Sequence, residues 1–262
     1  MKRLNIILLL LSILVICILL LIRLTQKKES FENFQNIEFV ISRYNESLDW
    51  TDKEPFNKYP IVLYNKGNNT DYNNNNIIKT VNLPNVGKCD HTYLYHIIHN
   101  YDNLADITVF LPGSADMSNK YFRAVKVVET AEEHRDTSVM CDKYSDVKKD
   151  LYNFTMDTWE TSYDKNKEIN PDKTIKKSSI RPFGKWFESK FGDLHIEYVT
   201  YTGIFAISKD DILQHPKSYY ESFIKELEND VNPEVGHYIE RSWMAIFNPM
   251  KNPEILISHT PT

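Results

Sequence analysis

Nearly every residue from Leu4 to Ile22 is apolar, and this run limits what the start of the chain can form. Only Asn5 and Ser12 interrupt it. At about 1.5 Å per residue, a helix of this length reaches roughly 28 Å, which is close to the thickness of the hydrocarbon core of a bilayer. The run continues into "IRLTQKKES" and not into the small residues that follow the core of a cleaved signal peptide. We therefore predict a short tail at 1–3, an uncleaved transmembrane anchor at 4–23 and a polar linker at 24–36.

Positive charges lie on both sides of this anchor, because Lys2 and Arg3 precede it and Arg23, Lys27 and Lys28 follow it. The charge bias that sets the orientation of a membrane helix is therefore nearly balanced. We expect a single-pass membrane protein with its N-terminus in the cytosol and its large C-terminal domain in a lumen or outside the cell.

The rest of the 262 residues has the composition of one folded domain. A hydrophobic content of 42% and an aromatic content of 13% are too high for a disordered chain. The net charge of -5 and the lack of a basic stripe predict no nucleic-acid partner. Cys17 lies in the anchor, so Cys89 and Cys141 either form one disulfide or remain buried thiols.

Apolar runs and helical spacing alternate along this domain. Short apolar runs that end in polar or turn residues predict strands at Ile37–Ser42, Tyr59–Gly67, Asp106–Gly113 and His195–Lys209. Helical spacing predicts helices after Gly87 and at Asn119–Glu133, Asp210–Asp230 and Glu234–Phe247, with Ser208 as a cap and Pro216 in a first turn. This order predicts a single α/β sandwich at 37–250, with a mixed, mostly parallel sheet flanked by helices, and a C-terminal tail at 251–262.

Several common chemistries are excluded by the motifs that the chain lacks. The 7 glycines include no two separated by one residue, so there is neither a dinucleotide fingerprint nor a P-loop. H-E-x-x-H, G-x-S-x-G and paired C-x-x-C motifs are absent as well.

Polar residues follow three of the predicted strands. They are Arg43, Asn45, Glu46 and Asp49 after the first strand, Asn65 and Lys66 after the second, and Asp116 after the third. Because a parallel sheet brings such ends to one edge, Lys and Arg there can bind a diphosphate, and carboxylates can bind a metal ion or a sugar hydroxyl. The alternative is that they are ordinary turn and capping residues.

The last predicted helix contains "YIERSWMAIF", in which Glu240 and Arg241 interrupt an apolar sequence just before Trp243. Its apolar residues repeat at helical spacing and predict a core-facing stripe, whereas His237 and Glu240 lie on another face. If that face borders the strand ends, Glu240 can take a proton from an acceptor hydroxyl, and Arg241 can pair with a carboxylate or phosphate. The alternative is a structural ion pair between packed helices.

Blocks spread over Ile37–Phe247 resemble DUF3431, a family of proteins of unknown function found in fungi, bacteria and large DNA viruses. The blocks are "FVISRYNESLDW", "LYNKG", "LPNVGKCDHTYLYHIIHNYDNLADITVFLPG", "RPFGKWF", "GIFAISKDDILQHPKSYYE" and "NPEVGHYIERSWMAIF". They occur in the expected order.

A more distant resemblance is to nucleotide-sugar glycosyltransferases with the GT-A fold, many of which have a short N-terminal anchor. It rests on "SRYNE", "YNKG", "YLYHIIHNYDNLADITVF" and the closing Glu-Arg-x-Trp helix. The resemblance implies that Glu240 acts as the catalytic base. It also implies a nucleotide site made by Arg43, Asn45, Glu46 and Lys66, with Asn65 beside them.

The chain departs from that pattern in one respect, because it contains no Asp-x-Asp metal motif. Asp116 in "LPGSAD" is then the candidate ligand for an Mn²⁺ or Mg²⁺ ion. Otherwise the diphosphate is neutralised by Arg181, Lys185 or Arg241, with His237 near the diphosphate or the acceptor.

These observations predict a membrane-anchored glycosyltransferase that moves a sugar from a nucleotide sugar to a glycan, protein or lipid. The first alternative is a metal-dependent hydrolase that uses Glu46, Asp49, Asp116 and Glu240. The second is a catalytically inactive, membrane-tethered module that binds glycans or a protein.

Overall fold

A computed structural model describes residues 36–157, 175–195 and 197–258 of the protein. The predicted anchor at 4–23 lies outside these residues. Within them, no helix has both the length and the apolarity that a membrane span requires. The folded unit described below begins at Ile37.

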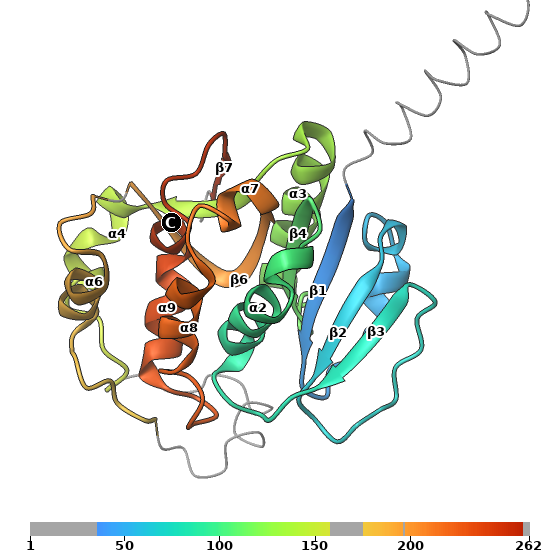
Figure 1. Cartoon of the computed structure of the whole chain (residues 1–262), viewed down its shortest axis with the longest axis horizontal. Helices are drawn as coiled ribbons and strands as arrows, with labels where there is room; N and C mark the ends of the chain where they lie inside the picture. Colours follow the sequence, from blue (N-terminus) through green and yellow to red (C-terminus); the bar gives the residue numbers. More distant parts are fainter. Residues whose placement is uncertain (1–35, 158–174, 196, 259–262) are drawn as a thin grey trace, which may run out of the picture. The chain divides into compact units, whose positions relative to one another are not determined.

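The centre of the fold is a seven-stranded sheet with the order β3-β2-β1-β4-β6-β5-β7 (Figure 1). All neighbouring strands pair in parallel except β6, which is antiparallel to both β4 and β5. The predicted fold class, an α/β domain with a mixed and mostly parallel sheet, is therefore confirmed. The strands span β1 Ile37–Arg43, β2 Ile61–Asn65, β3 Ile77–Asn82, β4 Ile107–Pro112, β5 Ser138–Lys143, β6 Tyr198–Ser208 and β7 Glu254–Ile257.

Helices cover both faces of the sheet, because successive strand residues point to opposite sides. In β1, Val40 packs into the core that contains α2, α8 and α9, whereas Phe39 and Ile41 pack into the core that contains α3. Figure 1 shows α2, α8 and α9 in front of the sheet and α3 behind it. The helices span α2 Lys88–His99, α3 Ser118–His134, α4 Tyr144–Leu151, α6 Phe183–Phe191, α7 Lys209–Ile212, α8 Lys217–Ile224 and α9 Glu234–Ile246, and the 3-10 turns span Asp49–Asp52, Phe56–Lys58 and Tyr101–Asn103.

Several elements of the structure differ from the sequence prediction. The helix predicted at Asp210–Asp230 is divided into α7, capped by the Ser208 side chain, and α8, which Pro216 precedes. β3 and β5 were not predicted. β7 pairs with β5, so the sheet includes residues beyond 250, where we expected only a tail.

Candidate functional site

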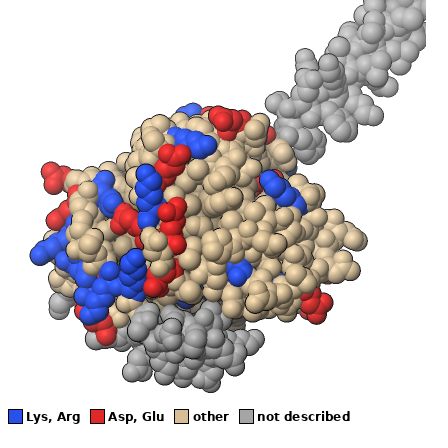
Figure 2. All heavy atoms as spheres, turned by 60° about the horizontal axis from the view of Figure 1, so that its bottom comes forward, with Lys and Arg blue, Asp and Glu red and all other residues tan. Residues whose placement is uncertain are grey.

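A cavity of about 230 Å³ lies at the carboxyl ends of β1, β2 and β4. From β1 the chain continues to β2 on one side, and β4 lies on the other side of β1. The strand order therefore reverses at β1, which makes this position a topological switch point of the sheet. Such a reversal opens a crevice in α/β sheets that commonly binds ligands. Figure 2 looks toward this end of the sheet, where acidic and basic side chains gather next to one another in the middle and on the left. The lining residues are Ser42, Arg43, Tyr44, Glu46, Lys66, Asn85, Lys88, Cys89, Asp90, Pro112, Ser114, Lys120, Thr202, Val231, Gly236, His237 and Glu240.

Arg43 ends β1 and fixes one corner of the pocket. It is 1% exposed, and its guanidinium donates to the Glu46 carbonyl at 2.7 Å, to Asn65 Oδ1 at 2.8 Å and to the Asn69 carbonyl at 2.6 Å. A buried arginine requires several acceptors of this kind, because an uncompensated charge is costly in the interior. Arg43 therefore joins the ends of β1 and β2, and its remaining nitrogen, Nη2, has no acceptor among the described residues.

The Glu46 carboxylate closes the turn after β1. Its Oε2 accepts the backbone N–H groups of Tyr44 at 2.6 Å and Asn45 at 3.1 Å. It also lies against Gly113, where an added Cβ would come within 2.9 Å of Oε2. Glycine at this position lets the backbone after β4 approach the carboxylate closely.

Lys66 joins the end of β2 to the start of α2. Its ammonium donates to the Val86 carbonyl at 2.6 Å and to the Lys88 carbonyl, and burial lowers its pKa to about 8. The N-cap of this helix is Gly87, which has a φ of 57° and provides no side-chain cap. The first N–H groups of a helix have no partners within the helix. The start of α2 therefore presents N–H donors beside the pocket-lining residues Lys88, Cys89 and Asp90.

Asp90 is the most deeply buried acid of the site, at 3% exposure. Its Oδ1 accepts the indole N–H of Trp243 at 2.9 Å, which joins the first turn of α2 to α9. Burial, together with the nearby Glu240 charge, raises the pKa of Asp90 to about 8. At neutral pH, Asp90 is therefore mostly a neutral carboxylic acid inside a polar pocket.

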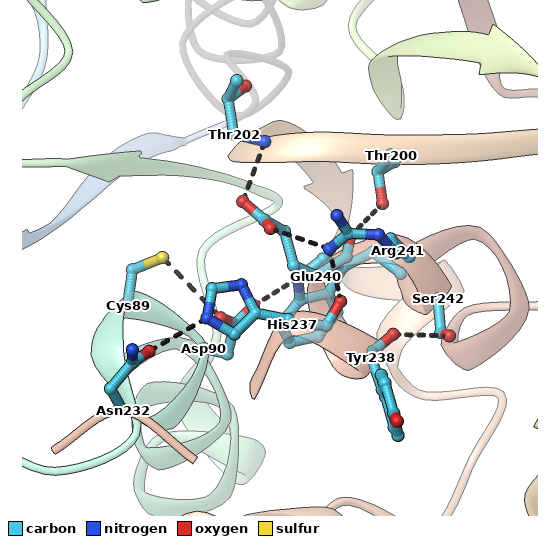
Figure 3. Close-up of polar contacts among 11 residues, drawn as sticks. Cys89, Asp90, Thr200, Thr202, Asn232, His237, Tyr238, Glu240, Arg241 and Ser242 are labelled. Carbon is cyan, nitrogen blue, oxygen red and sulfur yellow. Dashed lines mark hydrogen bonds and ion pairs between the residues drawn. The ribbon is translucent and has the colours of Figure 1, made fainter. Parts of the chain in front are cut away.

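Glu240 extends from α9 into the same pocket, with 23% of its side chain exposed (Figure 3). Its Oε1 accepts the backbone N–H of Thr202 at 3.0 Å, and its Oε2 lies 3.4 Å from Nη1 of Arg241. The Thr200 hydroxyl donates to the backbone carbonyl of Glu240 at 2.5 Å. The carboxylate is thus held on one side and open to the cavity on the other.

The N–H donor to Glu240 belongs to a bulge in β6. Between Val139 and Cys141 of β5, the paired residues of β6 run from Phe205 to Thr200, so β6 contains extra residues there. Thr202 has a φ of 74° and Gly203 a φ of 62°. Left-handed backbone is strained for a β-branched residue, by roughly 1–3 kcal/mol, and such strain is frequent at functional sites.

Basic side chains outnumber ionised acids around the cavity. The basic side chains are Arg43, Lys66, Lys88 and Lys120, and the acidic ones are Glu46, Glu240 and the mostly neutral Asp90. Lys120 donates to Ser114 Oγ at 2.9 Å, and the Lys88 ammonium has no hydrogen-bond partner among the described residues. The pocket therefore suits an anionic ligand.

His237 lines the pocket one turn before Glu240 on α9. Its Nε2 lies 2.9 Å from Asn232 Oδ1. Burial, with the charges of Arg241 and Lys88, lowers the pKa of His237 to about 3. The imidazole is therefore neutral at physiological pH and can contact a ligand by hydrogen bonding but not by charge.

The structure separates the sequence-predicted site residues into two groups. The cavity is lined by Arg43, Glu46, Lys66, His237 and Glu240. Asn65 lies just outside the lining and accepts a hydrogen bond from Arg43. Asn45 is exposed and accepts the Asn69 N–H. The remaining candidates Asp49, Asp116, Arg181, Lys185 and Arg241 do not line it.

Arg241 and Arg181 are occupied elsewhere. The Arg241 guanidinium lies 4.0 Å from the Phe154 ring centre and 5.0 Å from that of Tyr201, and it donates to the His237 carbonyl. Arg181 pairs with Glu234 and Asp157. Lys185 is exposed on α6, and Asp116 is exposed in the turn after β4.

No metal centre is assembled from the described residues. Within 36–157, 175–195 and 197–258, no group of three or more His, Cys, Asp or Glu side chains is arranged to hold a metal ion. Of the carboxylates of the hydrolase alternative, only Glu46 and Glu240 line the cavity. Cys89 and Cys141 are free thiols, which decides between the two alternatives for this pair.

Sequence reasoning missed Lys88, Cys89, Asp90, Lys120 and Thr202. Lys88, Cys89 and Asp90 could have been found from the predicted helix start after Gly87. Because β3 was not predicted, the sequence did not show that this helix follows directly after a strand of the sheet. Thr202 carried no sequence signal, because its conformation depends on the bulge.

The buried Asp90 makes the stability of the protein depend on pH. Its pKa is near 8 in the folded state and 3.8 as the reference value, so its stabilising contribution is complete below about pH 4 and is lost as the pH rises through 8. Asp90→Asn removes this titration. We expect the free energy of unfolding of the variant, relative to the wild type, to rise steadily from pH 5 to about pH 8.5 in urea titrations.

The matched control for this measurement is Asp116→Asn, which alters an exposed carboxylate. We expect this surface substitution to change the free energy of unfolding by no more than about 0.5 kcal/mol. Parallel curves for Asp90→Asn and the wild type would show that Asp90 is ionised throughout and would contradict the assignment.

Comparisons with known proteins identify the family but not the activity. The family model described as "Protein of unknown function (DUF3431)" matches residues 39–255, in agreement with the resemblance seen in the sequence. No curated protein sequence matches the chain significantly. One similar solved structure is a CMP:2-keto-3-deoxy-manno-octonic acid synthetase complexed with CTP, with a TM-score of 0.32 and 12% identity over 72% of this chain and 82% of that chain.

Proposed function

We propose a function for this chain, which belongs to the DUF3431 family: its pocket binds a nucleotide sugar, and the protein transfers the sugar to a hydroxyl of a glycan, protein or lipid. The observation that supports this most directly is the juxtaposition of Lys88 and Lys120 with Glu240 in one cavity at the strand ends. Transfer of a sugar from a diphosphate to a hydroxyl requires basic groups near the diphosphate and a carboxylate near the hydroxyl.

The diphosphate end of the donor is assigned to the start of α2. A helix N-terminus presents N–H donors and the positive end of the helix dipole, and it binds phosphate groups readily. Lys88 lies at this start with its ammonium uncommitted, and Lys120 has used one of its three donors on Ser114. We assign the diphosphate to these two lysines in place of Arg181, Lys185 and Arg241, which lie outside the cavity lining.

The acceptor end is assigned to Glu240. The acceptor oxygen attacks the anomeric carbon of the sugar, the bond from that carbon to the diphosphate oxygen breaks, and the acceptor proton passes to the Glu240 carboxylate. The nucleoside diphosphate leaves with both electrons of the broken bond. Positioned carboxylates contribute about 10²–10⁴-fold to such proton transfers.

A GT-A-like arrangement, an anchor at 4–23 and an Mn²⁺ or Mg²⁺ ion remain parts of this proposal. The described residues do not form a ligand set around Asp116, so we derive no step through a metal ion. The anchor would keep the domain at a membrane, where a lipid or a membrane glycoprotein can serve as acceptor.

The test is calorimetric and thermal titration of the full-length protein in detergent micelles with UDP, GDP, CMP and their sugar derivatives. A ligand at about 100 times its dissociation constant adds about 2.7 kcal/mol of stability, which thermal melting detects. Hydrogen bonds to charged groups contribute about 1.5–3 kcal/mol each, so we expect Lys88→Ala and Lys120→Ala to weaken nucleotide binding about tenfold or more.

The control variant is Lys185→Ala, which removes an exposed lysine outside the cavity and is expected to leave the affinity unchanged. The titrations are repeated with Mn²⁺ and Mg²⁺. Binding of a metal ion alone would favour the hydrolase alternative. Folded protein that binds no nucleotide and no metal ion would favour the inactive binding module.

A further inference from the structure

The bulge of β6 at Thr202 and Gly203 has no role in holding the sheet together. β6 pairs with β4 up to Phe205 and with β5 again at Thr200, and Thr202 and Gly203 pair with neither strand. Both residues have left-handed backbone, at φ values of 74° and 62°. A regular strand would avoid this strain and would keep the ladder continuous.

What the bulge does is to turn one N–H group toward α9. The Thr202 N–H points at Oε1 of Glu240 at 3.0 Å (Figure 3). In an unbroken strand this donor would lie in the plane of the sheet, where the ladder uses it. Bulges next to active sites commonly redirect a group in this way.

The bulge is also fixed in place from the α2 side. The Tyr93 hydroxyl, which is fully buried, donates to the Gly203 carbonyl at 2.8 Å. A Cβ at Gly203 would come within 2.9 Å of Cys89 Sγ, so α2 packs directly against the Gly203 backbone. The direction of the Thr202 N–H is therefore set in part by α2, which also lines the pocket.

We propose that the Thr202–Gly203 bulge is the positioning element for the Glu240 carboxylate. This inference rests on the proposed function and deepens it, because it assigns the residues that hold the base toward the acceptor hydroxyl. The Thr202 N–H restrains Oε1, and Arg241 Nη1 lies 3.4 Å from Oε2, so the position of the carboxylate is fixed on the side of the bulge. Misplacement of a catalytic group by about 1 Å can lower the rate about 10²-fold.

The chain offers a matched pair of glycines for the test. Gly203 and Gly192 both have a positive φ, 62° and 61°, so alanine strains the backbone at each of them. An added Cβ at Gly192 meets no atom within 4 Å, whereas at Gly203 it meets Cys89. Only Gly203→Ala should therefore move the Thr202 N–H.

Turnover of nucleotide sugars by the full-length protein in micelles is measured for both variants. We expect Gly203→Ala to lower kcat about 10- to 100-fold with an unchanged KM for the donor, and Gly192→Ala to leave kcat unchanged. Cys89→Ala in the Gly203→Ala background removes the steric conflict and should restore part of the rate. Equal kcat values for the two glycine variants would overturn the proposal.

Hydrogen exchange separates this proposal from the proposed function. The Thr202 amide should exchange slowly in the wild type and much faster in Glu240→Ala and Gly203→Ala, with the paired Ala206 amide as internal reference. If no donor is turned over by the wild type, the proposed function fails, while the exchange data still decide whether Thr202 holds Glu240. Fast exchange at Thr202 in the wild type would refute the positioning role.

Strain gives one more check. Thr202→Gly keeps the N–H donor and removes the cost of left-handed backbone at a β-branched residue. We expect this variant to melt at a higher temperature than the wild type and to retain the slow exchange of the residue 202 amide. A lower melting temperature would show that the threonine conformation is not strained and would contradict the argument from the bulge.

Discussion

Replacing Glu234 by alanine is expected to lower the free energy of unfolding by about 3–5 kcal/mol, because it leaves buried donors and a charge without their partner. The Glu234 side chain is 0% exposed. Its carboxylate accepts the N–H of Met156 at 2.7 Å and of Ser178 at 2.8 Å, and both oxygens lie within 2.9 Å of the Arg181 guanidinium. One side chain at the start of α9 thus holds two distant segments and a cation.

The pKa of Glu234 gives this prediction a pH dependence. Burial alone would raise the pKa, but the hydrogen bonds from Arg181, Met156 and Ser178 together lower it below its reference value of 4.5. A carboxylate with a lowered folded-state pKa stabilises the protein above its unfolded pKa, and this contribution is lost as the pH falls through the folded value. The wild type should therefore lose stability in acid, and Glu234→Ala should lose less.

Asp157→Ala is the control, because Asp157 is the exposed partner of the same arginine, at 2.8 Å. Surface ion pairs contribute about 0–1 kcal/mol, so this variant should unfold nearly like the wild type. Urea unfolding of full-length protein in micelles measures both. Similar losses of unfolding free energy for Glu234→Ala and Asp157→Ala would contradict the assignment of Glu234 as the residue that holds Met156, Ser178 and Arg181 together.

The sequence predicted the strands and helices whose apolar residues are contiguous or regularly spaced. β2 and β4 are buried along their whole length, and β1 is buried at every residue except Glu38, so each reads as an apolar run. β3 and β7 lie at the two edges of the sheet, and no residue of either is fully buried. Edge strands are held by backbone pairing on one side, which leaves little trace in the sequence.

The sequence predicted those site residues that lie at the ends of predicted strands or on one face of the last predicted helix. Arg43, Glu46 and Lys66 were placed by their positions after β1 and β2, and Glu240 by its face of α9. The Asp90–Trp243 bond spans 153 residues and depends on how α2 packs on α9, which a periodic pattern does not reveal. The contacts around Thr202 also depend on tertiary packing and are not revealed by a periodic pattern.

The pair of charges before Trp243 is explained by helix geometry. Adjacent residues on a helix point about 100° apart, so Glu240 and Arg241 leave α9 in different directions. Glu240 reaches the cavity, whereas Arg241 packs between the rings of Phe154 and Tyr201. Arg241 thus covers the neighbouring part of the domain, and of the two, the acid is the residue that the cavity can use.

Glu240→Gln is the substitution with the largest expected effect on activity. Gln keeps an oxygen that accepts the Thr202 N–H but does not take up a proton at neutral pH. We therefore expect kcat for sugar transfer to fall about 10²–10⁴-fold, while the affinity for the nucleotide and the melting temperature stay close to those of the wild type. Transfer kinetics, calorimetry and thermal melting of the same preparation measure the three quantities.

Glu46→Gln distinguishes the two carboxylates that line the cavity. Glu46 Oε2 accepts the N–H groups of Tyr44 and Asn45, and a neutral amide oxygen accepts them less strongly than a carboxylate does. We therefore expect Glu46→Gln to loosen the turn after β1 and to weaken nucleotide binding more than it lowers kcat. A large loss of kcat in Glu46→Gln with full activity in Glu240→Gln would assign the base to β1 instead of α9. Because the two acids lie on different elements, the split between affinity and rate tests which side of the cavity binds the donor and which side activates the acceptor in the proposed transfer.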